Sequence, residues 1–68
     1  MKNFLKEERN KRDWTQAQLA EMVQVSRQTI ISIETNRYVP SIILCLKISS
    51  VLKVPIEKIF RLEPEDLV

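Results

Sequence analysis

The sequence predicts an all-α fold, a compact bundle of five helices with no strand pairing of consequence. Two observations support it. Thr15, Ser26 and Ser41 each stand where a side chain can cap the start of a helix. After the first two caps, apolar residues recur at helical spacing and gather on one face. The residues expected in the core are Leu5, Leu19, Ala20, Val23, Val25, Ile30, Ile33, Ile42, Cys45, Leu46, Ile48, Leu52, Ile56, Ile59 and Phe60.

The bulk properties limit the chain to one small domain. We expect residues 1–68 to form a single unit, with a tail over 62–68. A chain of this length buries only about 60% of its unfolded surface, so we expect modest stability unless it associates. The net charge of +2 is no argument for nucleic acid. Its distribution, with a basic start and an acidic end, suggests one anion-facing side or simply a solvated charged helix.

The composition argues against an enzyme and against a bound metal or cofactor. There is no His, the commonest general base and metal ligand, and no Gly for a phosphate-binding loop. Cys45, the single cysteine, is expected to be a reduced, buried thiol; redox sensing or an intermolecular disulfide is the alternative. No apolar stretch is long enough for a bilayer, and Met1 is followed by charge, so we expect a cytoplasmic protein with no membrane partner and no small-molecule ligand.

The first helix is expected from about Lys2 to Arg12, with Leu5 pointing inward. The second begins after Thr15, because Gln18 stands three residues later and completes a capping box. Trp14 and Leu19 have the spacing of the hydrophobic staple that often accompanies such a cap.

The third helix follows almost at once. Ser26 caps it, with Val25 and Ile30 at staple positions. Residues 24–26 leave room only for a turn, and Ala20 is small enough for the two helices to approach closely. This arrangement, over about 16–35, is a helix-turn-helix, whose second helix can enter the major groove of DNA.

The exposed face of the third helix carries side chains suited to base edges. Arg27 and Gln28 occupy its first turn, and Ile31 and Ser32 lie one turn on. Arg can form a bidentate pair with guanine and Gln with adenine, each worth about 1–3 kcal/mol of discrimination. Ile31 packs either on a thymine methyl group or on the protein surface.

Five further residues are candidates for DNA phosphates. Gln16 begins the second helix, where free N–H groups and the helix dipole favour an anion. Thr29, within the third helix, and Asn36, Arg37 and Tyr38, at its end and after it, are candidates for the phosphates that flank the groove. For Tyr38, packing within the loop is the alternative.

The C-terminal half has more apolar surface than one small domain needs. Ser41 caps a fourth helix over about 42–53 that is apolar almost all round, and a short fifth helix is expected over 56–60. An apolar surplus of this kind usually marks an interface, so we expect a symmetric homodimer. The alternative is a monomer whose tail folds back over its own core. The expected interface residues are Ile43, Leu44, Phe60, Leu62, Leu67 and Val68.

One series of residues carries a resemblance to a known family. It is Thr15-Gln16, Leu19-Ala20, Val23, Val25-Ser26-Arg27-Gln28-Thr29-Ile30, Ile33-Glu34 and Pro40-Ser41. In this order and spacing, the chain from about Leu5 to Phe60 resembles the phage-repressor and Cro-like helix-turn-helix regulators of the xenobiotic-response-element type. The resemblance implies a lambda-repressor-like DNA-binding fold.

The resemblance also implies an ion pair and shows two departures. In the family, an Arg at the position of Arg9 pairs with the residue here numbered Glu34; the alternative is an exposed Arg with no fixed partner. The family usually has Gly in the inter-helix turn and after the recognition helix, where this chain has Gln24 and Asn36. Asn tolerates the left-handed conformation fairly well and Gln less so, so we expect a slightly strained turn.

The function expected from these features is a sequence-specific DNA-binding transcriptional regulator, most simply a repressor that binds a pseudo-palindromic operator as a dimer. An antitoxin that binds both its operator and a toxin protein is the alternative, although the tail is short for such a partner. An adaptor that makes protein contacts only is a third class. The polar residues Arg27, Gln28 and Ser32 argue against it.

Overall fold

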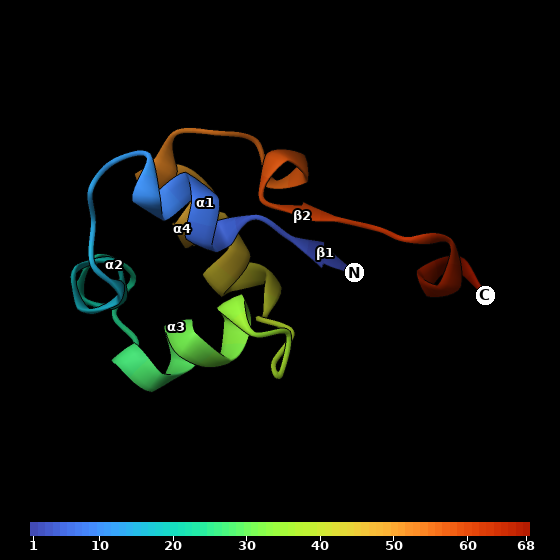
Figure 1. Cartoon of the computed structure of the whole chain (residues 1–68), viewed down its shortest axis with the longest axis horizontal. Coiled ribbons are helices and arrows are strands. Elements are labelled where there is room, and N and C mark those ends of the chain that lie inside the picture. Colours follow the sequence, from blue (N-terminus) through green and yellow to red (C-terminus); the bar gives the residue numbers. More distant parts are fainter.

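The computed structural model describes all residues from 1 to 68 and is mostly helical (Figure 1). It has four α-helices, two 3-10 helices and one antiparallel sheet of two strands. In chain order the elements are β1 (Lys2–Asn3), α1 (Leu5–Asn10), α2 (Gln16–Val23), α3 (Arg27–Glu34), α4 (Ile42–Leu52), η1 (Ile56–Lys58), β2 (Phe60–Arg61) and η2 (Pro64–Leu67).

The helices surround a single cluster of 11 buried apolar residues, most of which were predicted. Every α-helix and the segment 59–60 contribute, and α2 packs most extensively on α3. Val25, Cys45 and Ile56 were predicted to be buried but are only partly so. The cluster consists of Leu5, Leu19, Ala20, Val23, Ile30, Ile33, Leu44, Ile48, Leu52, Ile59 and Phe60.

The orientation predicted for α4 is wrong. Ile42 and Leu46, expected in the core, are 74% and 57% exposed, whereas Leu44, expected at an interface, is only 7% exposed. The row Leu44, Ile48 and Leu52, spaced by four residues, is the face that packs inward. Because this helix is apolar almost all round, its composition did not indicate which face turns toward the core.

The prediction of five helices without a sheet is also wrong at both ends of the chain. Lys2 and Asn3 pair with Arg61 and Phe60 as a short antiparallel sheet. The first helix therefore begins only at Leu5, whose N–H is bonded to the Asn3 side-chain oxygen at 2.9 Å. The expected fifth helix is one 3-10 turn, Ile56–Lys58, because Phe60 leaves in the extended conformation of β2.

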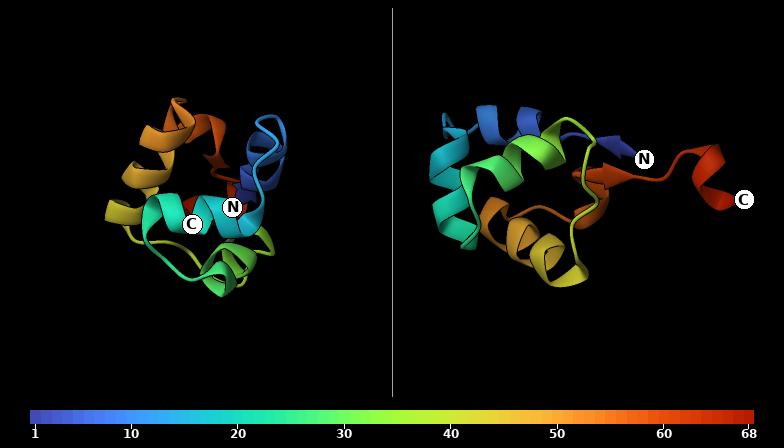
Figure 2. Two further views of the ribbon diagram at one scale, coloured as in Figure 1. Left: turned by 90° about the vertical axis from the view of Figure 1, so that its left-hand side faces the viewer. Right: turned by 90° about the horizontal axis from the view of Figure 1, so that it is seen from below.

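The C-terminal tail projects away from the helices (Figure 2). Its base is held by the N-terminal ammonium of Met1, which lies 3.2 Å from Glu63 Oε1 and 3.0 Å from Asp66 Oδ2. Leu67 and Val68 are 72% and 108% exposed, so the tail does not fold back over its own core.

A carboxylate in α1 is also held by cations. Glu8 is only 8% exposed, and it accepts hydrogen bonds from Lys11 at 3.0 Å and from Arg12 at 3.2 Å. Arg12 in turn donates to the Leu52 carbonyl at 2.6 Å, which links α1 to the end of α4. The hydrogen bond from Lys11, with that from Arg12, lowers the pKa of Glu8 below its usual range despite its burial.

This pKa shift predicts a specific acid sensitivity. Because the folded pKa of Glu8 is depressed, its carboxylate stabilises the fold above the unfolded pKa, about 4.3 for Glu. That contribution is lost as the pH falls through the folded pKa. We expect Glu8→Gln to lower the Tm at neutral pH and to lower it much less in acid. Thermal unfolding followed by circular dichroism over a pH series measures this. Glu7→Gln, at an exposed neighbour, is the control, and an equal Tm loss at every pH would contradict the prediction.

Candidate nucleic-acid interface

The first helix of the helix-turn-helix begins at the predicted capping box. The Thr15 hydroxyl accepts the Gln18 backbone N–H at 3.0 Å, and the Gln18 side chain accepts the Thr15 N–H at 2.8 Å. Trp14, at the predicted staple position, packs against the core cluster. These contacts fix the direction in which the chain enters α2.

The second helix of the helix-turn-helix, α3, is capped by Ser26, whose hydroxyl accepts the Thr29 N–H at 3.1 Å. The helix turns Ile30 and Ile33, both 0% exposed, into the core. Arg27 and Gln28 are exposed, whereas Ile31 and Ser32 are partly buried. All four predicted base-reading residues therefore lie off the core-facing side of α3.

Both turns that flank α3 contain a non-glycine residue in the left-handed conformation. Gln24 has φ 63° and Asn36 has φ 60°, and these are the two positions where the family usually has Gly. Each turn is closed by a Schellman motif of two hydrogen bonds. After α2, the N–H groups of Gln24 and Val25 donate to the carbonyls of Glu21 at 3.3 Å and Ala20 at 3.0 Å. After α3, those of Asn36 and Arg37 donate to the carbonyls of Ile33 at 3.1 Å and Ser32 at 2.8 Å. The backbone geometry usual for glycine is thus kept without glycine.

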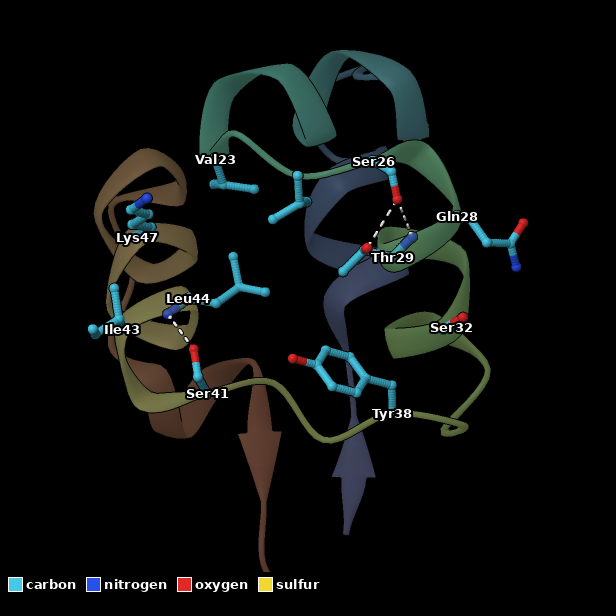
Figure 3. Close-up of a pocket in the computed structure, with 11 residues that line it drawn as sticks. Val23, Ser26, Gln28, Thr29, Ser32, Tyr38, Ser41, Ile43, Leu44 and Lys47 are labelled. Carbon is cyan, nitrogen blue, oxygen red and sulfur yellow. Dashed lines mark hydrogen bonds between the residues drawn. The ribbon is translucent and has the colours of Figure 1, made fainter.

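A hollow lies between α3 and the first turns of α4 (Figure 3). Thr29 and Ser32 border it from α3, and Tyr38 from the following loop. The Gln28 side chain stands at its rim and points outward (Figure 3). The remaining lining residues are Val23, Val25, Ser26, Ser41, Ile43, Leu44 and Lys47. One lysine and no carboxylate line this surface, so it favours an anion.

The predicted phosphate residues fall into three groups. Thr29 and Tyr38 border the hollow, although the Thr29 hydroxyl is hydrogen-bonded to that of Ser26 at 2.9 Å. Asn36 and Arg37 are exposed in the turn after α3. Gln16 is not among the residues that line the hollow, and its amide is bonded to the side chains of Glu34 and Arg27.

Sequence reasoning did not assign three polar residues of the hollow to the site: Ser26, which caps α3, Ser41, which caps α4, and Lys47 of α4. The sequence signal for the two serines was their role as helix caps. Ser41 accepts the Leu44 N–H at 3.2 Å, which places it at the N-terminal end of α4. Lys47 is the one charged residue of α4.

The pair implied by the family resemblance is present as a bidentate contact. Arg9 Nε donates to Glu34 Oε2 at 2.8 Å and Nη2 to Oε1 at 3.3 Å. The third guanidinium nitrogen, Nη1, donates to the Trp14 carbonyl at 2.7 Å. The two side chains are 9% and 3% exposed, so the pair is almost completely removed from solvent.

The structure contains no cluster of three or more His, Cys, Asp and Glu side chains that could hold a metal ion. No helix has the length and apolar character needed to cross a membrane.

Comparison with known proteins assigns the family. Residues 5–59 match the helix-turn-helix family of the Cro and C1 type. This chain belongs to that family. It is therefore a DNA-binding transcription regulator of the helix-turn-helix type, and the family is not one of enzymes.

Relatives of the same size occur in bacteria and archaea. The chain is 44% identical over 66 residues to the uncharacterised HTH-type transcriptional regulator YgzD of Bacillus subtilis, covering 97% of this chain and 100% of that one. It is 47% identical over 66 residues to an uncharacterised HTH-type transcriptional regulator of Methanocaldococcus jannaschii, with the same coverage.

A solved structure has the same mostly helical fold. The chain superimposes with a TM-score of 0.77 and 31% identity on a chain of the SinR protein/SinI protein complex. The match covers 94% of this chain and 63% of that one, so this chain spans less than two thirds of its structural neighbour.

The strained turn generates a prediction about stability. Replacing Gln24 by Gly removes the Cβ that disfavours φ 63°. We expect Gln24→Gly to raise the free energy of unfolding by about 0.5–1 kcal/mol, since the glycine entropy cost offsets part of the relief. Urea unfolding measures this. Asn36→Gly is the matched control and should gain less, because Asn tolerates this conformation better. If Asn36→Gly raises the free energy of unfolding as much as Gln24→Gly or more, strain at Gln24 is not the cause of the gain in stability.

Proposed function

We propose that this regulator is a repressor that reads a specific operator with α3 and occupies it as a symmetric homodimer. The observation that carries the proposal is the surface formed by the exposed face of α3 and the adjacent hollow. Hydrogen-bonding side chains and Lys47 line that surface, and no carboxylate does. Protein surfaces that meet duplex DNA combine these two properties.

The base-reading part of the proposal concerns Arg27, Gln28, Ile31 and Ser32. The first two are exposed in the first turn of α3, the part of a recognition helix that meets base edges. Ser32 lies one turn later at the border of the hollow, within reach of the same groove. Ile31 supplies an apolar contact for a thymine methyl group.

The phosphate-binding part places the DNA backbone along the hollow and the turn after α3. The phosphates of one DNA strand are contacted from the hollow by Tyr38, Thr29 and Lys47. They are contacted from the turn after α3 by Asn36 and Arg37. Gln16 contributes through its backbone N–H in the first turn of α2, where N–H groups lack helical partners. Its side-chain amide is already bonded at both ends.

The dimer interface we propose differs from the one expected from the sequence. Leu44 belongs to the core, and Ile43 borders the DNA-facing hollow, whereas Phe60 belongs to the core and also lines the groove described next. A separate apolar groove lies beside the base of the tail. It is lined by Met1, Val39, Pro40, Ile42, Cys45, Ile56, Glu57, Phe60, Arg61 and Leu62.

A second copy of the chain is the occupant we assign to this groove. Val39, Ile42 and Leu62 are 73%, 74% and 67% exposed there, so their apolar surface has no cover within the chain. The tail next to the groove carries two more uncovered residues, Leu67 and Val68. A two-fold axis beside the groove places the groove and tail of one protomer against the groove and tail of its partner. Dimerisation also doubles the few base pairs that one recognition helix can read.

A protein partner other than a second copy is the competing use of the groove, as in an antitoxin. The structural neighbour was solved in a complex between two proteins. That function would be favoured if the purified chain is a monomer and a co-purifying or co-encoded protein binds it 1:1 in the groove.

The repressor role has a direct test. Sequences selected from random duplexes by the purified protein define the operator. A promoter that carries this operator should then be transcribed less in vitro when the protein is added. An increase in transcription would make the protein an activator.

The interface predicts two classes of DNA-binding variant. Arg27→Ala and Gln28→Ala should lose base contacts and reduce discrimination by about 1–3 kcal/mol each, whereas Arg37→Ala should weaken binding to all sequences and lower the salt slope by about 1. Affinities for the selected operator and for a scrambled duplex, measured across a salt series, separate the two classes. An equal loss on both duplexes for Arg27→Ala would disprove its base-reading role.

The groove predicts the oligomeric state. Ile42→Glu places a charge in the proposed interface at a residue exposed in the single chain, so it should abolish dimerisation without unfolding the protein. Sedimentation velocity, with and without operator, measures this. Met22→Glu, at a 43% exposed residue of α2 outside the groove, is the control. A parent protein that binds its operator one-to-one on a non-symmetric site would overturn the dimer.

A further inference from the structure

The left-handed residue in the turn between α2 and α3 makes a contact that glycine could not make. Gln24, with φ 63°, carries a side-chain amide whose Oε1 accepts a hydrogen bond from Lys47 Nζ at 3.3 Å. Lys47 belongs to α4 and is the one cation that lines the hollow beside the recognition helix (Figure 3). The turn of the helix-turn-helix is thus joined directly to the hollow.

Glutamine is an unfavourable residue for the conformation of this turn. A left-handed residue other than glycine brings its Cβ too close to the following carbonyl oxygen, and glycine would close the same turn without this contact. Strained residues persist where the surrounding structure holds them, and they cluster at functional sites. The Gln24 side chain makes one hydrogen bond, the one to Lys47. This bond is therefore the candidate for what the strained residue contributes.

An amide oxygen is a suitable partner for a lysine that must also bind a phosphate. The ammonium group has three N–H donors, and Gln24 accepts from one, so two remain for a phosphate. The amide is neutral, so it leaves the positive charge in place, whereas a carboxylate would offset it. Lys47 forms no ion pair in the structure. Gln24 thus restrains the ammonium without neutralising it.

The restraint acts on a side chain that is otherwise mobile. Lys47 is exposed, and lysine has one of the largest rotamer entropies of all residues. An unrestrained lysine loses this entropy when it binds a phosphate, and the loss weakens the complex. A hydrogen bond in the unbound protein removes part of that loss. The gain in affinity is the same for every DNA sequence, because phosphates carry no sequence information.

We propose that Gln24 is a positioning residue for DNA affinity: its amide holds the Lys47 ammonium at the hollow, ready for a phosphate. This inference rests on the proposed phosphate-binding role of Lys47. If Gln24 had a purely structural role, a variant with a relaxed turn would bind DNA at least as tightly as the parent. The positioning role instead predicts that such a variant gains stability and loses affinity.

The test compares two replacements of Gln24. Gln24→Gly relaxes the turn and removes the acceptor, whereas Gln24→Met keeps the strain and the side-chain length and removes only the acceptor. Affinities are measured for the operator selected from random duplexes and for a scrambled duplex. We expect each variant to lower both affinities by the same factor, roughly 2-fold to 10-fold, the range for one ordered, rotamer-rich side chain. Urea unfolding should show that Gln24→Gly is more stable than the parent and that Gln24→Met is not.

Variants of two lysines show whether the effect passes through the Lys47 ammonium. Lys47→Met should weaken binding to both duplexes and lower the salt slope by about 1. In the Lys47→Met background, Gln24→Met should lower the affinity no further. Lys53→Met is the matched control, because it removes an exposed lysine at the C-terminal end of the same helix, outside the hollow. It should leave both affinities nearly unchanged.

The outcomes distinguish this inference from the proposal on which it rests. If Lys47→Met binds both duplexes as tightly as the parent, the phosphate-binding role of Lys47 fails, and this inference fails with it. If Lys47→Met weakens binding but Gln24→Met does not, the positioning role alone is overturned. The positioning role is also overturned if Gln24→Met lowers the affinity equally with and without Lys47, or if Gln24→Gly gains stability and binds DNA as tightly as the parent.

Discussion

The contact between Arg9 and Glu34 is the interaction on which the arrangement of this protein depends most. It joins α1 to α3, and the third nitrogen of the same guanidinium ties down the Trp14 carbonyl just before α2 begins. A buried ion pair adds little net stability relative to a well-packed apolar pair. Removing one partner, however, typically costs about 3–5 kcal/mol, because the other charge is left buried. The pair therefore excludes alternative packings more than it strengthens the fold.

The same contact helps to fix where α2 begins relative to α1 and α3. Trp14 packs on the core beside the point where Arg9 holds its carbonyl, and Thr15 then caps α2. The α2 helix can reach α3 only through the left-handed turn at Gln24, whose Schellman bonds continue directly into the Ser26 cap. A strained residue is tolerated there because the elements on both sides are fixed independently.

Local signals in the sequence predicted the helix-turn-helix well. Caps, staple spacing and the position of the turn are properties of adjacent residues. Two of the four left-handed residues, Gln24 and Asn36, were located by comparison with glycine positions in the family, whereas Asp13 and Lys53 were not. The sheet could not be found this way, since it pairs Lys2–Asn3 with Phe60–Arg61, almost the whole chain apart. Two residues per strand leave no alternation to detect. The hollow itself was not predicted. The exposed residues on its α3 side follow from helical spacing, but Lys47 enters only through the packing of α4.

The unusual composition of α4 is explained by the number of surfaces it serves. Leu44, Ile48 and Leu52 fill the core, and Ile42 and Cys45 line the groove beside the tail. Ile43 and Lys47 border the hollow next to the recognition helix. A helix with one solvated face would need a polar stripe, and this helix has none of the necessary width. The proposed dimer groove and the DNA-facing hollow are thus built on neighbouring faces of one rigid helix. In the proposed dimer, the position of the partner along α4 would therefore fix the distance between the two recognition helices.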